Sequence, residues 1–407
     1  MKLISLCLSA LCVGDALASS FARTSAKPEY HSVSRDVARR SKLAKRDAST
    51  LCSSTGSIKP KFFIISMFES EADIWYEDTI LNLYANNVTV PGFSPLYPDA
   101  HCTASGEVCQ MTTGEGEINA AGSVNALWLS GCFDLTSTYF MIAGISGGNP
   151  HVVTTGSVTF AKYAVQVGLQ EEFDQSQVPA NATSGYYPQG AYYPDEANPI
   201  DYPGSLYGTE VFEVNENLLD RVFYVASLAT LNDTQAAAEY RATYGYAPAN
   251  QPPSVVKCDS ATSDQYWSGS VLGYAFSNYT ELMTNGTGLY CGTQQEDNAT
   301  LESLLRGAIL KKLDFSRVII MRTISDFDRA PPGETEVYHL LYADQEGFEP
   351  SIQNIYNAGI EVVKDVLMYW NGTYDKGLKP GNYIGDVFNS LPGDIPPNIG
   401  TPADYIN

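Results

Sequence analysis

The chain is poor in positive charge. Its 407 residues include 24 Lys and Arg against 46 Asp and Glu, which gives a formal net charge of −22. A chain this acidic repels the phosphates of nucleic acids and of anionic membranes. We therefore expect no nucleic-acid partner. The negative charge can also serve simply to keep the protein soluble, which requires no binding partner.

Long apolar runs are missing beyond residue 46. A membrane-spanning helix needs about 20 consecutive apolar residues. The longest apolar segments here, "YFMIAGI" and "RVIIM", have the length of strands. We predict a protein that does not span a membrane. The sequence carries no signal for an oligomeric state.

Several common metal-binding, catalytic and nucleotide-binding motifs are also missing. The chain has no Cys-x-x-Cys and no His cluster, which argues against zinc. It has no Gly-x-Ser-x-Gly, no P-loop lysine motif and no Gly-x-Gly-x-x-Gly. The Gly-rich stretch "GEGEINAAG" (114–122) carries two Glu that would repel a dinucleotide phosphate. We expect no metal and no cofactor.

The N-terminus has the pattern of an export signal. Residues 1–18 have a basic start, an apolar middle and a small-residue end, Ala16-Leu17-Ala18, which is typical of a secretory signal peptide. Residues 19–46 are rich in Ser, Arg and Lys and end in the dibasic pair Lys45-Arg46. We interpret them as a pro-segment removed by a dibasic-cutting protease, or as a disordered tail that stays attached.

Cysteines and sequons agree with export. Two of the eight Cys lie in the predicted signal peptide, and the remaining six suggest disulfides. Cys102–Cys109 would close a local loop and Cys258–Cys291 a longer excursion, which leaves Cys52 with Cys132, but six cysteines allow 15 pairings. We predict a secreted or cell-surface (cell-wall) glycoprotein. The N-x-S/T sequons are Asn87, Asn181, Asn232, Asn278, Asn285, Asn298 and Asn371.

Residues 58–407 read as a single α/β domain. Short apolar runs alternate with segments of helical periodicity, which favours a sheet covered on both faces. Residues 174–210 are rich in Tyr, Pro and Gly and read as a surface insertion, and residues 277–292 read as surface because they hold two sequons and much Gly and Asn. We predict strands in 59–68, in 137–148, where the strand ends in a Gly/Ser turn, and in 316–326, and helices in 71–86, 215–231, 234–244, 298–313 and 349–370.

Polar turns follow several of these strands. In open α/β sheets, ligands gather beyond the carboxyl ends of the strands. Asp326 stands in such a turn, just past the run "RVIIM". Taken alone, each carboxylate in these turns reads as a helix cap or turn residue. The turns lie at 67–73, 144–149, 258–269 and 322–329, and a fifth polar segment, 293–300, precedes a helix.

Five segments together resemble the fungal purine nucleoside permease family: "MFESEADIW", "TTGEGEINAAGSVNAL", "MIAGISGGNP", "GSVTFAKYAV" and "RTISDFDRAPPGE". The resemblance covers essentially all of residues 58–407. That family is similar to nucleoside phosphorylases and nucleosidases, which cleave purine N-glycosidic bonds. The resemblance implies a three-layer α/β sandwich with a central mixed sheet, like those enzymes.

The resemblance also implies roles for individual residues. Asp326 would protonate N7 of the leaving purine, and Glu71, or with less support Glu69, would activate water. Glu296 would bind the ribose hydroxyls, which matters as the sugar becomes oxocarbenium-like. The further expected substrate contacts are Gln295 beside Glu296, Ser325 beside Asp326, Ser146, Gly147 and Gly148 near the sugar, and Tyr266 or Trp267 stacked on the base, with ordinary core packing as the alternative for both aromatic residues.

The chain departs from the related enzymes at two points. It has Gln295 where they carry Met, and "SMFESE" offers two carboxylates and no Arg to hold phosphate. Water is therefore the expected nucleophile. We carry three hypotheses: an exported purine nucleosidase, a non-catalytic nucleoside-binding protein that assists transport, and a storage or wall glycoprotein with a retired enzyme fold.

Overall fold

The computed structural model describes residues 50–52, 58–180, 182–189 and 206–397. The predicted signal peptide and pro-segment lie outside the described residues, as does much of the Tyr/Pro/Gly-rich insertion, so these predictions stay predictions. Within the described ranges, no helix is both long enough and apolar enough to cross a membrane.

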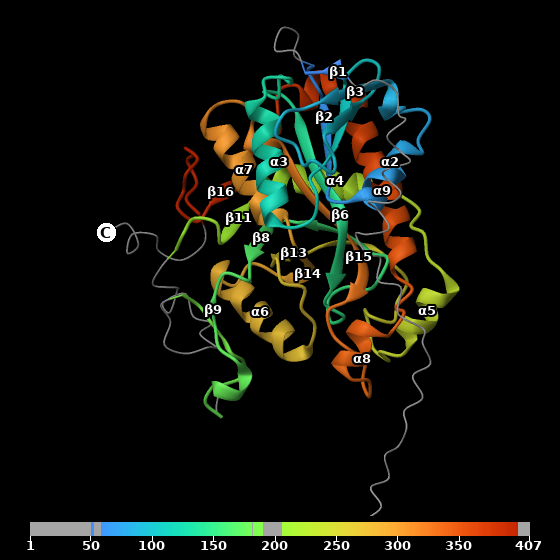
Figure 1. Cartoon of the computed structure of the whole chain (residues 1–407), viewed down its shortest axis with the longest axis vertical. Helices are drawn as coiled ribbons and strands as arrows, with labels where there is room; N and C mark the ends of the chain where they lie inside the picture. Colours follow the sequence, from blue (N-terminus) through green and yellow to red (C-terminus); the bar gives the residue numbers. More distant parts are fainter. Residues whose placement is uncertain (1–49, 53–57, 181, 190–205, 398–407) are drawn as a thin grey trace, which may run out of the picture. The chain divides into compact units, whose positions relative to one another are not determined.

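One mixed sheet forms the centre of the domain (Figure 1). Its two longest strands, β6 (Tyr139–Gly148) and β15 (Val318–Phe327), pair in parallel along their whole lengths. On the other side of β6, strand β2 (Phe62–Ser66) is parallel, and β5 (Val108–Thr112) is parallel to β2. This edge continues through β4 (Asp99–Cys102), β3 (Asn86–Thr89) and β1 (Thr50–Leu51).

The remaining strands extend the sheet from β15 and from the far end of β6. Antiparallel to β15 runs β7 (Val158–Ala161), which pairs with β12 (Val255–Lys257). Antiparallel to the end of β6 runs β14 (Tyr290–Gln294). Beyond β14 the order is β13 (Asp259–Thr262), β8 (Tyr163–Gln166), β11 (Val211–Glu213) and β16 (Gly385–Asp386), while β9 (Glu171–Glu172) and β10 (Tyr186–Tyr187) form a separate hairpin.

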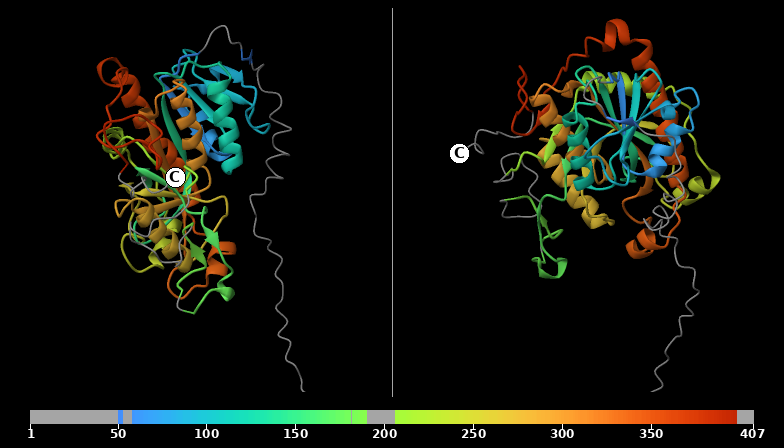
Figure 2. Two further views of the ribbon diagram at one scale, coloured as in Figure 1. Left: turned by 90° about the vertical axis from the view of Figure 1, so that its left-hand side faces the viewer. Right: turned by 45° about the horizontal axis from the view of Figure 1, so that its top comes forward.

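Helices cover both faces of the sheet, as the alternation of side chains requires. Phe63 of β2 joins the core under α3 (Glu117–Leu129) and α7 (Asp297–Ile309). Its neighbour Phe62 joins the opposite core, under α2 (Glu69–Tyr76), α4 (Glu216–Ala226) and α9 (Phe348–Met368). Figure 2 shows the strands in the middle with helices around them. The predicted α/β sandwich with a mixed central sheet is confirmed.

Shorter elements complete the described chain. Side chains cap three of the described α-helices, since Asn215 accepts from N–H groups at the start of α4, Thr234 does so for α5 (Gln235–Ala242) and Thr335 for α8 (Glu336–Leu341). The further elements are α5 (Gln235–Ala242), α6 (Ser270–Met283), α8 (Glu336–Leu341), the 3₁₀ turns Leu83–Ala85, Gln175–Gln177 and Phe315–Arg317, and a π turn at Trp370–Tyr374.

A predicted surface segment and a predicted helix differ from the structure. The expected surface segment 277–292 is wrong, because Tyr279, Leu282 and Met283 are buried in the second half of α6 and β14 begins at Tyr290. The Asn and Gly residues there suggested a surface loop. Tyr279 lies three and four positions before Leu282 and Met283, which is the spacing of one buried face of a helix. The helix expected over 71–86 ends at Tyr76, and the chain after it forms turns.

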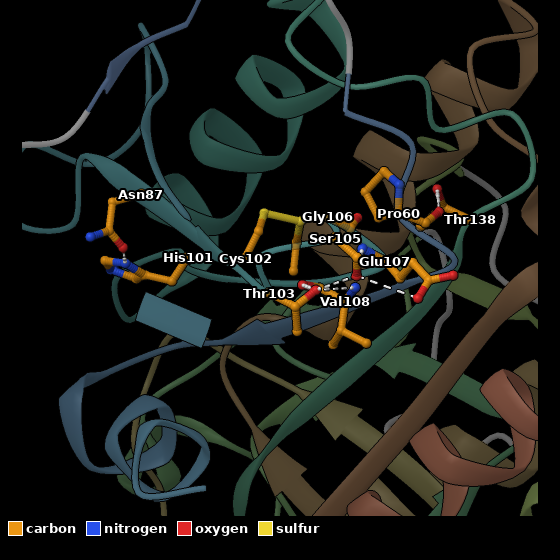
Figure 3. The surroundings of a disulfide bond; sticks show 11 residues. Pro60, Asn87, His101, Cys102, Thr103, Ser105, Gly106, Glu107, Val108 and Thr138 are labelled. Atoms are coloured by element: carbon orange, nitrogen blue, oxygen red, sulfur yellow. Dashed lines mark hydrogen bonds between the residues drawn. A yellow bond between two sulfur atoms is a disulfide. The ribbon is translucent and has the colours of Figure 1, made fainter. Parts of the chain in front are cut away.

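Three disulfides form: Cys52–Cys132, Cys102–Cys109 and Cys258–Cys291. The pairing outlined from sequence is therefore confirmed. Figure 3 shows the bond of Cys102, which ties the ends of β4 and β5 where these two strands face each other. Beside it, Asn87 Oδ1 lies 2.6 Å from His101 Nδ1, so this sequon side chain already has a partner.

The sequons differ in what surrounds them. Asn285 and Asn371 are exposed, whereas Asn298 is buried in α7. Asn298 Nδ2 donates to the carbonyl oxygens of Thr209 (2.8 Å) and Glu210 (3.2 Å). An N-linked glycan replaces one Nδ2 hydrogen and needs open space. Asn298 is therefore a structural residue, and the prediction of a glycan there is wrong. Asn181 lies outside the described residues.

We expect folded protein secreted by a glycosylating host to carry no glycan at Asn298, because a sugar would take one of the two Nδ2 hydrogens that bond in the interior and would find no open space there. Asn285 and Asn371, which are exposed, should carry glycans and serve as internal controls. Glycopeptide mass spectrometry measures the occupancy of each site. A glycan on Asn298 in folded, disulfide-bonded protein would contradict this placement.

Candidate active site

A buried arginine, Arg322 of β15, lies among the candidate residues and is 2% exposed. Its Nη2 donates to Asp297 Oδ1 (2.7 Å) and to Glu296 Oε2 (3.1 Å), and its Nη1 donates to the carbonyl oxygen of Ile145 (2.9 Å). Its Nε also reaches Asp297 Oδ1, at 3.1 Å. Burying a charge is costly unless it is paired and hydrogen-bonded. Arg322 thus pairs with two carboxyl groups inside the protein.

Glu296 is fixed at both oxygens. Oε2 faces Arg322, and Oε1 accepts the backbone N–H of Gly116 (2.9 Å). Gly116 has φ +86°, a left-handed conformation that suits glycine, and it stands just before α3. Burial raises the pKa of Glu296, and the charge of Arg322 opposes this rise. The Gly-rich stretch after β5 therefore holds a carboxylate with its backbone.

Asp297, which is fully buried, is the second partner of Arg322 and received no role from the sequence. Its Oδ2 accepts from Ser260 Oγ at 2.7 Å. Arg322 was missed as well, although one signal could have found it: an arginine inside an apolar strand needs buried carboxylates as partners.

Glu71 lies in the first turn of α2 and is almost fully buried. Its Oε2 accepts the N–H of Met67 and its Oε1 accepts the N–H of Ile145, both at 2.7 Å. A Cβ on Gly144 would lie 2.5 Å from Oε1, so only glycine permits this approach. Burial raises the pKa of Glu71 to about 8, while Arg322 lowers it. The group is therefore poised to exchange a proton near neutral pH.

Asp326 belongs to β15 itself, which agrees with the strand predicted over 316–326, whereas the turn predicted over 322–329 is wrong at this residue. The apolar run ends at Met321, but β15 continues to Phe327 because the Gly-rich end of β6 still pairs with it, with a bulge between Ile324 and Asp326. Asp326 faces Gly147 in this register. A Cβ on Gly147 would lie 3.4 Å from Asp326 Oδ2.

The carboxyl group of Asp326 is half-buried and held at both oxygens. Oδ1 accepts from Ser325 Oγ (2.6 Å) and Oδ2 accepts from the hydroxyl of Tyr266 (3.0 Å). Burial raises the pKa of Asp326, and the bonds from Ser325 and Tyr266 lower it. A raised pKa is what a carboxyl group needs to serve as an acid.

The segment Gly144–Gly148 connects these groups. Glu71 binds at Ile145, and Gly147 has Asp326 of β15 on one side and Thr293 of β14 on the other. Ser146 is buried, and its Oγ has no hydrogen-bond partner within the described part of the chain. The predicted turn over Ser146, Gly147 and Gly148 is instead the end of β6.

Other expected residues lie differently. Trp267 is 6% exposed and packs against Phe276, with ring centroids 4.8 Å apart, so it takes the core position that was the alternative interpretation. Gln295 is half-buried and donates to the carbonyl oxygen of Asp264 (2.7 Å). Asp328 pairs with Arg329 at 2.6 Å. Tyr266 alone of the two aromatic residues reaches the candidate acid.

The fold and the site thus define an α/β protein with buried and half-buried carboxyl groups at the ends of its central strands. A family model described as "Purine nucleoside permease (NUP)" matches residues 59–379. The chain belongs to the purine nucleoside permease family. A protein of Candida albicans (strain SC5314) named "Purine nucleoside permease" is 48% identical over 341 residues, which is 82% of each chain.

Other proteins resemble this chain at lower sequence identity. A "probable purine nucleoside permease" of Schizosaccharomyces pombe is 40% identical over 316 residues, covering 77% of this chain and 90% of that protein. The 5'-methylthioadenosine/S-adenosylhomocysteine nucleosidase of Neisseria meningitidis gives a TM-score of 0.44 at 14% identity, over 76% of this chain and 99% of that one. Futalosine hydrolase of Helicobacter pylori gives 0.44 at 12% identity, over 75% and 98%. Structural similarity at this level establishes no shared activity.

We expect Glu71→Gln to flatten the pH dependence of stability. Glu71 has a folded pKa of about 8 against an ordinary 4.5. Between these values the folded state holds a proton that the unfolded state releases, so the free energy of unfolding falls as pH rises, by about 1.4 kcal/mol per unit. Gln cannot titrate, so this contribution disappears.

Urea unfolding between pH values of about 5 and 7.5 measures the slope. Glu349→Gln is a matched control, because Glu349 is an exposed carboxyl in the first turn of α9. The amide introduced by Glu71→Gln has a single acceptor oxygen for the two N–H groups, so the variant also loses about 1–3 kcal/mol at every pH. Equal slopes in Glu71→Gln and in the unsubstituted chain would contradict the raised pKa.

Proposed function

We propose that this chain is an exported purine nucleosidase, which binds purine nucleosides, cleaves their N-glycosidic bond with water and so supports the uptake of purines. One observation carries the proposal: Glu71, Glu296 and Asp326, from three distant parts of the sequence, gather around strands β6 and β15 in three different surroundings. Carboxyl groups whose environments separate their pKa values can take different roles in acid–base chemistry.

Asp326 is the acid. A purine leaves poorly as an anion, so a proton must reach N7 as the bond between C1′ and N9 breaks. Asp326 is half-buried with a raised pKa, and it is reachable beside the exposed Tyr266. Ser325 fixes its Oδ1, so the other oxygen, Oδ2, is the one that meets the base. The ring of Tyr266 supplies a stacking face for that base.

Glu296 binds the ribose. Its two oxygens each have one protein partner, Gly116 and Arg322, and a carboxylate oxygen can accept a second hydrogen bond. Ribose hydroxyls can donate to the remaining positions. Arg322 lowers the pKa of Glu296 against the effect of burial, which favours the ionised form, and the negative charge of that form would stabilise the positive charge that develops on the sugar.

Glu71 activates the water, next to the β6 segment that we place against the sugar. Its raised pKa of about 8 makes its carboxylate a stronger base, and that ionised form, which accepts the proton, becomes populated as the pH approaches 8. Ser146, whose buried hydroxyl lacks a partner among the described residues, can orient the same water or a sugar oxygen. Gly147 and Gly148 let these groups approach closely because they have no side chains.

Water is preferred over phosphate as the nucleophile because the two arginines named at the site are already paired. Arg322 is bound to Glu296 and Asp297, and Arg329 is bound to Asp328. A phosphate would have to compete with these buried carboxylates for the same guanidinium groups.

A second candidate is a nucleoside-binding protein without catalysis. The names of the Candida and Schizosaccharomyces relatives favour it, because they describe permeases. The same residues would then hold a nucleoside for delivery. The three disulfides support the exported location in both cases. A storage or wall glycoprotein remains the third candidate, and only a protein that binds no nucleoside would favour it.

We expect purified protein to release free base and ribose from inosine or adenosine at equal rates with and without phosphate. Asp326→Asn should lower kcat by about 10²- to 10⁴-fold, because the amide cannot protonate N7. Chromatography of the reaction products measures both effects.

Asp344→Asn is the matched control, since Asp344 is an aspartate outside the set of residues assigned to the site. Release of a sugar phosphate that requires phosphate would contradict hydrolysis. Saturable binding without any product would favour the second candidate, and no binding at all would favour the third.

A further inference from the structure

The two oxygens of Asp326 are held from different sides. Oδ1 accepts from Ser325 Oγ (2.6 Å), and Ser325 is buried. Oδ2 accepts from the hydroxyl of Tyr266 (3.0 Å), and Tyr266 is 64% exposed. A ligand that arrives from solvent therefore meets Oδ2 first, together with the hydroxyl that already binds it.

The ring of Tyr266 has few other attachments. Tyr266 lies in the loop between β13 and α6, and its ring forms no aromatic pair with any described residue. Its neighbour Trp267, by contrast, packs against Phe276 in the core. The bond to Asp326 is the one hydrogen bond of the Tyr266 hydroxyl in the described chain. A phenol can donate to an ionised carboxylate and accept from a protonated one, so it matches Asp326 in either state.

We propose that Tyr266 is a positioning residue that competes with the purine for Oδ2 of Asp326. Nucleoside binding exchanges the phenol bond for a bond to the purine nitrogen and frees the ring to cover the base. This inference rests on the proposed function, because it needs Asp326 to meet a purine. It predicts that the hydroxyl and the ring of Tyr266 have opposite effects on affinity.

The hydroxyl also acts on the proton of Asp326. Burial raises the pKa of Asp326, and so does the nearby charge of Asp328, whereas Ser325, Tyr266 and His339 of α8 lower it. The charge of Asp326 in turn raises the pKa of Tyr266 well above 10, so its hydroxyl keeps its proton. Removal of this hydroxyl takes away one lowering influence. Asp326 then stays protonated, and active as an acid, up to a higher pH.

The test compares Tyr266→Phe and Tyr266→Ala with the unsubstituted full chain, with inosine as the probe. Tyr266→Phe keeps the ring and loses the hydroxyl, so the Kd should fall about threefold to tenfold, the size of one hydrogen bond partly replaced by water. The alkaline limb of kcat/KM against pH, which reports the free protein, should move to higher pH. Tyr266→Ala also loses the ring, so its Kd should exceed that of Tyr266→Phe.

Tyr274→Phe is the control for the substitution itself, because Tyr274 is an exposed tyrosine on α6. Circular dichroism checks that each variant folds. An unchanged Kd and an unchanged limb in Tyr266→Phe, in a chain that does release base, would overturn this inference and leave the proposed function standing. If Tyr266→Ala binds as tightly as Tyr266→Phe, the ring does not cover the base.

Two further outcomes separate the inference from the proposed function. If the unsubstituted chain binds inosine without turnover, no pH profile exists, and the inference is tested by the Kd of Tyr266→Phe alone. A lower Kd than that of the unsubstituted chain supports the inference, and an unchanged Kd overturns it. If the unsubstituted chain neither binds nor cleaves inosine or adenosine, the proposed function fails and this inference fails with it.

Discussion

The charge of Arg322 inside the sheet is the interaction on which the site depends. Arg322 stands in β15, and its guanidinium binds Glu296 and Asp297 at the start of α7 and the carbonyl oxygen of Ile145 on β6. Two carboxylates cannot stay ionised in the interior without such a partner. One side chain thus joins two strands and a helix, and it places Glu296 beside the backbone of Gly116.

The three candidate carboxyl groups lie in three different surroundings. Glu296 is paired with Arg322, Glu71 is buried between two backbone N–H groups with a pKa of about 8, and Asp326 stands half-buried at the end of β15. The side chains of Glu and Asp have similar pKa values in water, so the differences among these three groups come from their positions in the protein. The Gly-rich end of β6 makes these positions possible, because a Cβ would press against Glu71 at Gly144 and against Thr293 of β14 at Gly147, where Asp326 is also in contact.

The sequence predicted the layers of the fold and most helices, because apolar periodicity records which faces are buried. It also indicated Glu71, Glu296 and Asp326, through a resemblance to a family rather than through any single strong motif. It failed where tertiary pairing decides. The polar end of β15 stays a strand because β6 pairs with it, and Arg322 needs partners that lie far away in the chain, such as Asp297 on α7. Both interpretations of Trp267, base stacking and core packing, stayed open, because the sequence near a site does not show whether an aromatic ring faces a ligand or the core.

A structure of the Asp326→Asn chain with bound inosine tests the central claim most directly, since the weakened acid leaves the nucleoside intact in the site. The account predicts N7 of the base within hydrogen-bond distance of residue 326, ribose hydroxyls on the carboxylate of Glu296, and the Arg322 contacts to Glu296 and Asp297 unchanged. A nucleoside bound away from both Glu296 and residue 326, or an Arg322 that turns from its carboxylates to the ligand, would contradict it.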